Sequence, residues 1–442
     1  MLDRLNPQDA QILRLEAGAV RGHTCKLVVL DPSGGRPLPT AAALREHVSA
    51  RLDAAPRLRR RLVPTPLRLA RPAWIDDPEF DIARHVTRVP GAGPVGGARL
   101  EELVARVMTE RLDRAHPLWR LDVVEQLEDG GCALIWRVHH CLADGGTNVR
   151  LGAAVLWDDD PDPPSPPPSS WRAAPLPGAF ALAAHGLADR ARGRARPDRG
   201  RAGPSLLASR AVIGRELART ASVSGLAARA GPGRRVGRVT VPLDAARRAG
   251  KAIDEAATLN DVVLAIVAGG VRTWLERGAR PRTGVRVKVP VSLHDSTEGV
   301  GAGNRDSYFF VDLPVAEADP AGRLVAISRQ TSHRKRARDA EALYRLGRHR
   351  PIARWAMSPR VFTFGVSNVH GPPHDVFVLG ARVRELYSIA EIAQRHTLRI
   401  AVISAAGQLH FGLCADRDAV PDLQVLADGL RRASDELLER VS

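Results

Sequence analysis

The sequence predicts an α/β or α+β protein built from two halves, each with strands and covering helices. Three observations support this prediction. At 442 residues the chain is too long for one compact core. Its composition, 44% hydrophobic and 26% charged, is that of a folded protein. Strand-like and helix-like periodicities occur on both sides of a break at residues 158–171, DDDPDPPSPPPSSW, which carries six prolines.

The charge balance and the cysteines limit which binding partners and which cellular compartment we expect for this protein. Lys+Arg 65 against Asp+Glu 49 gives a net charge of +16, which favours anionic partners such as phosphorylated cofactors and acidic lipid headgroups. Aromatic residues make up only 4% and do not alternate with basic ones, so we expect no nucleic acid partner. Four scattered cysteines without a C-x-x-C pair predict neither a disulfide framework nor a zinc site, and favour a cytoplasmic location. The longest apolar stretches are too short to span a membrane, so any membrane contact is expected to be peripheral.

The first half combines a helix, a strand and a second helix. Residues 100–113, LEELVARVMTERLD, carry leucines and valines at helical spacing. Residues 132–140, CALIWRVHH, predict a strand that ends at a histidine pair. Because consecutive strand residues point to opposite faces, we expect one histidine to face inward and the other outward. A tight turn then leads into a helix at 147–157, TNVRLGAAVLW.

The break is followed by a basic stretch. Residues 189–201, DRARGRARPDRGR, contain six arginines, and a helix-like stretch begins at Pro204. We interpret the arginine-rich run as a solvated helical face and a mobile loop, with a patch that binds lipid or phosphate as the alternative.

The second half is again mixed. Predicted strands flank a predicted helix, further strands follow, and a helix with apolar residues on one side ends the chain. The strands are at 237–243, 285–293, 360–373 and, as a pair, 398–416, and the helices are at 260–278 and 422–441. The predicted domains are therefore an N-terminal one at 1–157, a linker with helices at 158–235, and a C-terminal one at 236–442.

The stretch VHHCLADGG at 138–146 raises the question of catalysis. A neutral imidazole can remove a hydroxyl proton at physiological pH, and a nearby carboxylate can orient it or brace its loop. A metal site would need further ligands, and no second cluster offers them, so we expect no metal. A Ser-His-Asp hydrolase would need a G-x-S-x-G elbow, which the sequence lacks. The structural alternative is that the histidines close the strand and Asp144 starts the next helix.

Several motifs, in order, resemble those of the wax ester synthase/diacylglycerol acyltransferase family. VHHCLADGG fits its HHxxxDG signature, which is shared with the wider superfamily of CoA-dependent acyltransferases and condensation domains. The other resemblances are to its PLW element in HPLWRLDVVE at 116–125, its Asn-Asp block in LNDVVLAIVAGGVRTWL at 259–275, its Gly-Asn block in GAGNRDSYFFVDLP at 301–314, and its SNV-x-GP block in SNVHGPP at 367–373.

The resemblance implies an activity and a fold. It implies an O-acyltransferase that esterifies a diacylglycerol or long-chain alcohol with acyl-CoA as co-substrate, without a permanently bound cofactor. The implied fold has two chloramphenicol-acetyltransferase-like subdomains, each a mixed sheet with covering helices, with the active site at their interface. By resemblance His140 is the general base for direct attack on the thioester, His139 is less important, Asp144 holds the loop geometry, and Gly145 lets the chain turn.

Further candidates come from the other motifs. Thr258 and Asp261 resemble a capping box, which leaves Asn260 on the first helical turn with an amide that could donate to an oxyanion, as the resemblance also implies. The alternative is that Asn260 is itself the cap. Asn304 could shape the substrate channel or simply form a turn. We interpret Trp119 as an architectural core anchor.

The acceptor stays open. The hairpin ISAAGQL at 403–409 carries Ala405 and Ala406 where relatives often have an aromatic residue beside Ser or Asn. The alternatives are therefore an acyltransferase or condensation enzyme for another hydroxyl or amine acceptor, and a non-catalytic lipid-surface protein of the same fold that docks through 189–201. An anionic membrane or lipid-droplet surface is the expected partner.

Overall fold

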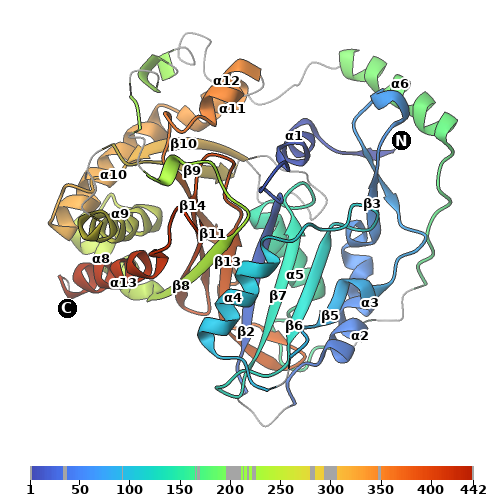
Figure 1. Ribbon diagram of the computed structural model, residues 1–442, viewed down its shortest axis with the longest axis horizontal. Helices are drawn as coiled ribbons and strands as arrows, with labels where there is room; N and C mark the ends of the chain where they lie inside the picture. Colours follow the sequence, from blue (N-terminus) through green and yellow to red (C-terminus); the bar gives the residue numbers. More distant parts are fainter. Residues whose placement is uncertain are drawn as a thin grey trace.

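Two six-stranded mixed sheets lie side by side in the molecule, and helices cover them (Figure 1). The computed structural model describes residues 2–32, 37–91, 93–164, 166, 170–195, 211–212, 214–216, 219–221, 225–278, 284–292, 306–346 and 350–440. The two-subdomain α/β architecture expected from the sequence is therefore confirmed. Most of the predicted helix from Pro204 lies outside the described residues.

The first sheet carries the histidine strand near its centre. Its strands, in spatial order, are β12 (Phe377–Val378), β13 (Ala381–Ala390), β2 (His23–Leu30), β7 (Cys132–His139), β6 (Trp119–Val124) and β5 (Val86–Arg88). Only β5 and β6 are parallel, and the other neighbours are antiparallel. The helices α2 (Ala41–Arg51) and α5 (Gly145–Val155) pack on one face and α4 (Gly97–Val107) on the other.

The second sheet is built mainly from the C-terminal half. Its strands, in spatial order, are β10 (Asp306–Asp312), β9 (Arg286–Ser292), β11 (Phe364–His370), β14 (Leu398–Ala405), β15 (Gln408–Asp416) and β8 (Arg234–Pro242). The strand β11 is parallel to both its neighbours. The covering helices are α8 (Leu243–Ile253), α9 (Leu259–Arg277), α10 (Pro320–Arg336) and α13 (Leu423–Glu439).

The alternation of side chains explains which face each sheet buries. In β9, Val287 and Val289 enter the core beneath α9, so Lys288 between them faces the opposite side. The helix α9 is apolar on nearly all sides and is accordingly buried along most of its length. The strands and helices predicted at 132–140, 260–278, 398–416 and 422–441 are confirmed, with ends that differ by one or two residues, and the helix predicted at 100–113 is observed at 97–107.

The two sheets are not separate in sequence. The strands β12 and β13 come from the C-terminal half, yet β13 pairs with β2 of the first sheet. It also packs on β14 and β15, where Gly412 leaves room for the Ser388 carbonyl. The range 236–442 therefore contributes to both sheets, and the division at 157 and 235 stays a prediction.

The linker is fastened to the first half at both ends. Asp158 forms an ion pair with Arg51 and its backbone pairs with Phe377. At the other end the Arg59 guanidinium lies 4.4 Å from the centre of the Trp171 ring. Both ends of the predicted break at 158–171 thus contact the N-terminal half.

Smaller elements complete the described part of the chain. A three-stranded sheet consists of β1 (Asp3–Arg4), β4 (Ala73–Asp76) and β3 (Arg60–Val63). The remaining helices are α1 (Pro7–Leu15), α3 (Ile82–His85), α6 (Ala179–Ala195), α11 (Asp339–Leu346) and α12 (Arg350–Ala356), with 3₁₀ turns η1 (Leu52–Ala54), η2 (Pro56–Arg59), η3 (Pro66–Arg68) and η4 (Gly225–Ala227). No helix in the described ranges is both long and apolar enough to cross a bilayer.

Candidate active site

The histidine pair stands at the end of β7, where neighbouring strands hold the backbone. The His139 N–H donates to the Leu118 carbonyl (2.9 Å), and the His140 N–H donates to the Gly22 carbonyl (2.8 Å). His139 is 1% exposed, whereas His140 is only half-buried. His139 is therefore enclosed and His140 is partly accessible, while the expectation that one faces inward and the other outward stays a prediction.

Both ring nitrogens of His139 make hydrogen bonds within the protein. Nδ1 accepts from the Cys141 N–H (3.1 Å), so Nε2 carries the proton and donates to Glu16 (3.3 Å). Burial lowers the pKa of His139, although the Glu16 carboxylate opposes this. Gly22 has a left-handed φ of +74°, and a Cβ there would lie 2.7 Å from His139 Nε2. His139 is thus held as a brace for the loop.

Glu16 is a site residue that the sequence motifs do not reveal. It follows α1, and its side chain is 2% exposed although it forms ion pairs with Arg111 and Arg114. Burial alone would raise the pKa of Glu16, but hydrogen bonds from His139 and Arg114 lower it below its ordinary value. Its distance of 123 residues from His139 in sequence explains why no spacing pattern finds it.

His140 lies under the influence of two opposite charges. Burial lowers the pKa of His140, the Asp144 carboxylate raises it, and the Arg399 guanidinium lowers it. Arg399 extends from β14 of the second sheet, and a side chain on the paired Gly365 of β11 would collide with it. His140 therefore belongs to the first sheet and senses a charge from the second. Because its pKa is lowered, its imidazole is neutral at physiological pH and can accept a proton.

Asp144 caps the helix behind the histidines. It is 3% exposed, and its Oδ1 accepts from the Thr147 N–H (2.7 Å) at the start of α5. The expectation that Asp144 starts the next helix is therefore confirmed. This capping position also agrees with a role of Asp144 in holding the loop. The buried Lys26 also senses Asp144: burial lowers the pKa of Lys26 to about 8, and the carboxylate raises it.

Gly145 brings two motifs into contact. A Cβ at Gly145 would lie 2.8 Å from Val369 Cγ2 of β11, in the SNV block. The same test at Gly146 finds nothing closer than 3.7 Å. Position 145 therefore requires glycine because the backbone there comes close to Val369. This close approach places the HHxxxDG loop against β11.

The Asn-Asp block forms the expected capping box. Thr258 is the N-cap of α9, and its N–H donates to Asp261 Oδ2 (2.8 Å). The second carboxylate oxygen of Asp261 accepts from Thr331 Oγ1 (2.7 Å). Thr258 is the cap, so the alternative that Asn260 caps the helix is wrong. Asn260 is half-buried in the first turn, and its part in stabilising an oxyanion stays a prediction.

The remaining candidates have different outcomes. Asn304 lies outside the described residues. Trp119 is 3% exposed, donates from Nε1 to the Leu58 carbonyl (2.7 Å) and stacks on His85 at 4.5 Å between ring centres. The interpretation of Trp119 as a core anchor is confirmed. In the described ranges, no group of three or more His, Cys, Asp or Glu side chains could hold a metal ion.

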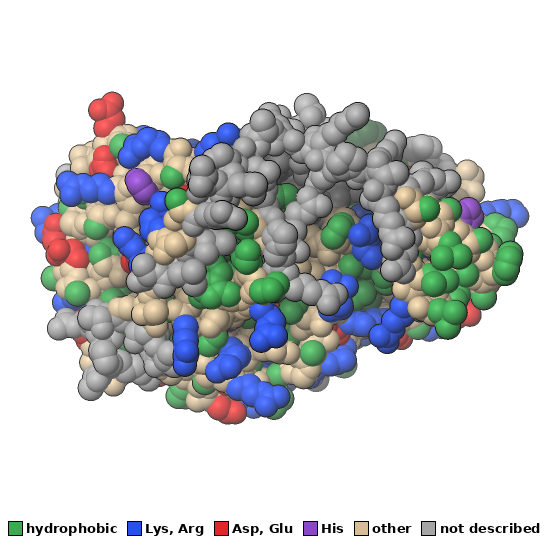
Figure 2. Space-filling model, turned by 90° about the horizontal axis from the view of Figure 1, so that it is seen from above, with side chains coloured by type: hydrophobic (Ala, Val, Ile, Leu, Met, Phe, Trp, Pro, Cys, Tyr) green, Lys and Arg blue, Asp and Glu red, His purple; other side chains and the backbone are tan. Residues whose placement is uncertain are grey.

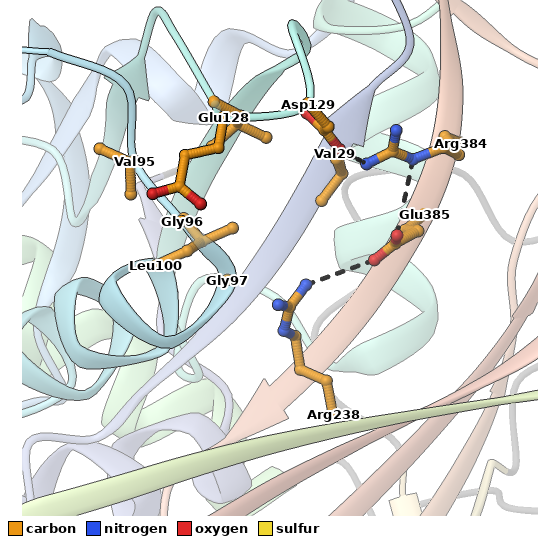
Figure 3. A pocket seen from close by; sticks show the side chains of 11 residues that line it. Val29, Val95, Gly96, Gly97, Leu100, Glu128, Asp129, Arg238, Arg384 and Glu385 are labelled. Atoms are coloured by element: carbon orange, nitrogen blue, oxygen red, sulfur yellow. Dashed lines mark hydrogen bonds and ion pairs between the residues drawn. The ribbon is translucent and has the colours of Figure 1, made fainter.

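A cavity of about 240 Å³ opens between α4, β8 and β13, away from the histidines (Figure 3). It touches Val29, which is six residues along β2 from His23, the partner of His139, and hence roughly 20 Å away. Glu385 lies between Arg238 and Arg384 and forms ion pairs with both. These paired charges join the two sheets and identify the cavity as a seam between them.

A second, larger groove of about 960 Å³ is basic. It is lined by Arg219, Arg354 and Arg360 together with Trp355. Next to it, the Met357 sulfur accepts a hydrogen bond from Lys288 Nζ (3.4 Å).

Lys288 is a further basic side chain next to this groove. Its ammonium lies 3.9 Å from the centre of the Tyr308 ring. Burial, reinforced by the Arg399 charge, lowers the pKa of Lys288 to about 7. The Arg399 charge therefore acts on both Lys288 and His140.

Two family profiles match the sequence. The wax ester synthase/diacylglycerol acyltransferase catalytic domain matches residues 5–263, and the WS/DGAT C-terminal domain matches residues 302–438. A Mycobacterium tuberculosis protein named as a diacylglycerol O-acyltransferase is 34% identical over 98% of this chain and 97% of its own length. A second one from that species, named tgs1, is 31% identical over 90% of this chain and 88% of its own length.

Solved structures agree with the fold. The wax ester synthase/diacylglycerol acyltransferase from Marinobacter aquaeolei VT8 superimposes with a TM-score of 0.71 at 24% identity, over all of both chains. The first condensation domain of the calcium-dependent antibiotic synthetase gives a TM-score of 0.61 at 16% identity, over all of this chain and 96% of that one. At these identities the likeness concerns the arrangement of the two sheets.

Proposed function

The chain belongs to the wax ester synthase/diacylglycerol acyltransferase family and is an acyltransferase of that type, and from this premise we propose its substrates and mechanism. The proposed reaction transfers the acyl group of acyl-CoA to the hydroxyl of a diacylglycerol or a long-chain alcohol, giving triacylglycerol or wax ester. The observation that carries the proposal is His140, a half-buried imidazole at the end of β7 that senses the charge of Arg399 from the second sheet.

In the proposed mechanism His140 is the general base. Its imidazole takes the proton of the acceptor hydroxyl while the oxygen attacks the thioester carbonyl. The new C–O bond forms, the C–S bond breaks, and the proton on the imidazolium passes to the departing CoA sulfur. Asp144 favours the imidazolium, as the direction of its effect on the pKa of His140 indicates. No covalent acyl-enzyme is required.

Other groups support the base. The His139 ring, held by Glu16 and the Cys141 N–H, keeps the loop after β7 in place. The Asn260 amide is our candidate donor to the oxyanion that forms on the carbonyl oxygen. Such contributions are needed because a general base alone accelerates a reaction only about 10²- to 10⁴-fold.

The basic groove supports acyl-CoA as the donor. Arg354 and Arg360 offer guanidinium groups for phosphates, Arg219 next to them is paired with Asp312, and Trp355 offers an aromatic face for the adenine of CoA. A starter condensation domain of rhizomide synthetase, which shares the fold at a TM-score of 0.59 and 12% identity, has been solved with C8-CoA. We propose that the CoA phosphates occupy this groove and the thioester reaches toward Arg399.

The test measures release of CoA thiol from palmitoyl-CoA with hexadecanol, with a diacylglycerol, and with no acceptor. We expect acceptor-dependent release by the wild type and a loss of about 10²- to 10⁴-fold in His140→Ala. His374→Ala is the control, because His374 is a surface histidine paired with Asp159.

Three outcomes would count against the proposal. Full activity in His140→Ala would remove His140 as the base. Release with an amine or a short soluble alcohol, and not with either lipid, would favour another acceptor class. No release with any acceptor would favour a non-catalytic lipid-surface protein.

A further inference from the structure

We propose that the outer face of α6, with the leucines beside it, docks on an anionic lipid surface and so brings the acceptor to the histidine loop. This inference rests on the proposed function, because it concerns how a lipid acceptor is supplied. It assigns the docking to defined side chains in and around α6 (Ala179–Ala195). In Figure 1 this helix lies at the upper right, near the N-terminus.

The inner face of α6 is fixed to the protein. Leu182 is 5% exposed and packs with Ala73 and Ile75 of β4. One turn later, a Cβ at Gly186 would lie 2.9 Å from the Thr65 methyl carbon, so the backbone is close to the loop beneath. Asp189 accepts a hydrogen bond from Arg4 Nε (2.6 Å). These contacts set which side of the helix faces outward.

The outer face is apolar. Phe180 is 89% and Leu187 is 54% exposed, and Ala184 and Ala191 between and beyond them are exposed as well. Their spacing of four, three and four residues places all of them on one stripe of the helix. A surface helix ordinarily turns polar side chains outward, so this arrangement indicates a surface that is covered in use.

Four of the five large exposed hydrophobic side chains in the described residues lie on α6, shortly before it or in η3, which packs against it. Besides Phe180 and Leu187, the five include Leu67 (92%), Leu176 (49%) and Leu15 (45%). Leu67 lies in η3, which packs against α6, and it is held at a φ of +52°, which leucine rarely adopts. Leu176 precedes α6, and Leu15 ends α1. The concentration of four such side chains in one region argues against chance exposure.

Basic side chains lie in the loop that packs against α6 and near it. Arg71 senses the charges of Arg4 and Arg14, which together with burial lower the pKa of Arg71. Arg68, next to Leu67, is exposed as well. Seen from above, hydrophobic side chains gather at the right-hand end of the molecule with basic side chains at their edges (Figure 2).

This combination selects the occupant. An apolar stripe bordered by arginines fits acyl chains beneath anionic headgroups. A second copy of the chain would set arginine clusters against each other, in a protein that already carries a net charge of +16. The occupant that we propose is therefore a lipid surface with anionic headgroups.

The exposed end of α1 is next in the chain to a residue that contacts the histidine motif. Leu15 is 45% exposed at the end of α1, and the following residue, Glu16, turns inward to hold His139. A surface that receives Leu15 thus lies one residue from a side chain that touches the HHxxxDG motif. An acceptor hydroxyl at that surface would approach the histidines from the α1 side.

The experiment compares the wild type with the double variant Phe180→Asp, Leu187→Asp in vesicle co-sedimentation. The vesicles are phosphatidylcholine alone or phosphatidylcholine with phosphatidylglycerol. The control variant, Ala252→Asp with Gln424→Asp, adds the same charge at exposed positions on α8's end and α13. We expect salt-sensitive binding of the wild type and the control to the anionic vesicles, and binding at least ~10-fold weaker for the α6 variant.

Two results would overturn the docking proposal. One is equal vesicle binding by the α6 variant and the wild type. The other is a wild-type dimer, measured by light scattering, that becomes monomeric in the α6 variant, because the stripe would then be covered by a second copy. Circular dichroism of each variant verifies that it is folded.

An assay without vesicles separates this proposal from the proposed function. With hexanoyl-CoA and hexanol in solution, the α6 variant should retain wild-type activity, and it should lose activity at least ~10-fold on diacylglycerol held in anionic vesicles. A wild type that binds vesicles but transfers no acyl group from any donor would contradict the function and leave the docking intact. An α6 variant that is equally active on both acceptors would contradict the docking alone.

Discussion

The Arg399 guanidinium and the Asp144 carboxylate act on His140 in opposite directions. Arg399 disfavours the imidazolium and lowers the pKa of His140, whereas Asp144 favours it and raises the pKa. The protonation state of the proposed base therefore depends on one residue from each sheet. A change in either charge should be visible in how the reaction rate depends on pH.

We predict that Arg399→Met moves the acidic limb of the kcat/KM profile to higher pH. Loss of the positive charge raises the pKa of His140, so the neutral base appears only at higher pH. Asp144→Asn keeps a good helix cap but removes the negative charge, and should move the same limb to lower pH. Arg431→Met, at an exposed position on α13, is the control. Two variants that shift the limb in the same direction would contradict this account.

Individual site residues were predictable from the sequence only where they share a motif. His139, His140, Asp144 and Gly145 stand within seven residues of one another. Glu16 and Arg399 come from other segments, and only the pairing of distant strands places them beside the histidines. Nothing in local spacing encodes such proximity, because it depends on tertiary packing.

At the scale of elements, the loop after β7 and the strand β11 meet at Gly145 and Val369. The strand pattern and the capping box could be read from the sequence, since periodicity and caps are local signals. The pairing of β13 with β2 could not, because the alternation of apolar and polar residues in a strand does not identify the strand with which it pairs. The contact between the two motifs likewise became visible only in three dimensions.

We expect Gly145→Ala to lower kcat/KM roughly tenfold, because the added methyl group would meet Val369 Cγ2 and displace the histidine loop. Val369→Ala in the same chain should restore much of the loss by making room. Gly146→Ala is the matched control, since a Cβ there meets nothing within 3.7 Å. A defect in Gly145→Ala that Val369→Ala does not relieve would show that the contact is not the cause.

At the scale of the whole molecule, ion pairs at the seam tie the two sheets together. Arg238 of β8 in the second sheet reaches Glu385 of β13 in the first sheet and Glu101 of α4, which packs on that first sheet. The active-site residues come from both sides of this seam, although the seam cavity itself lies at the other end of β2. The seam ion pairs therefore help to set how His140 and Arg399 are positioned relative to each other, although the seam is far from both residues.

Removal of the central cation should loosen this connection. We predict that Arg238→Ala lowers the free energy of unfolding by about 1–2 kcal/mol, because two half-buried carboxylates lose their partner. Arg235→Ala, at an exposed position on the same strand, should have little effect. Urea unfolding followed by tryptophan fluorescence measures both, and equal midpoints for the two variants would contradict a stabilising seam.

The strand β13 also sets the order in which the protein can be completed during synthesis. The strand β2 has β7 on one side from residue 139 onward, but its other neighbour ends only at Ala390. At roughly 5–20 residues per second, the ribosome leaves that side of β2 unpaired for about 10–50 s. A nascent chain therefore carries an open sheet edge for most of its synthesis, and the sheet that holds the histidine pair is completed only when the polypeptide is nearly finished.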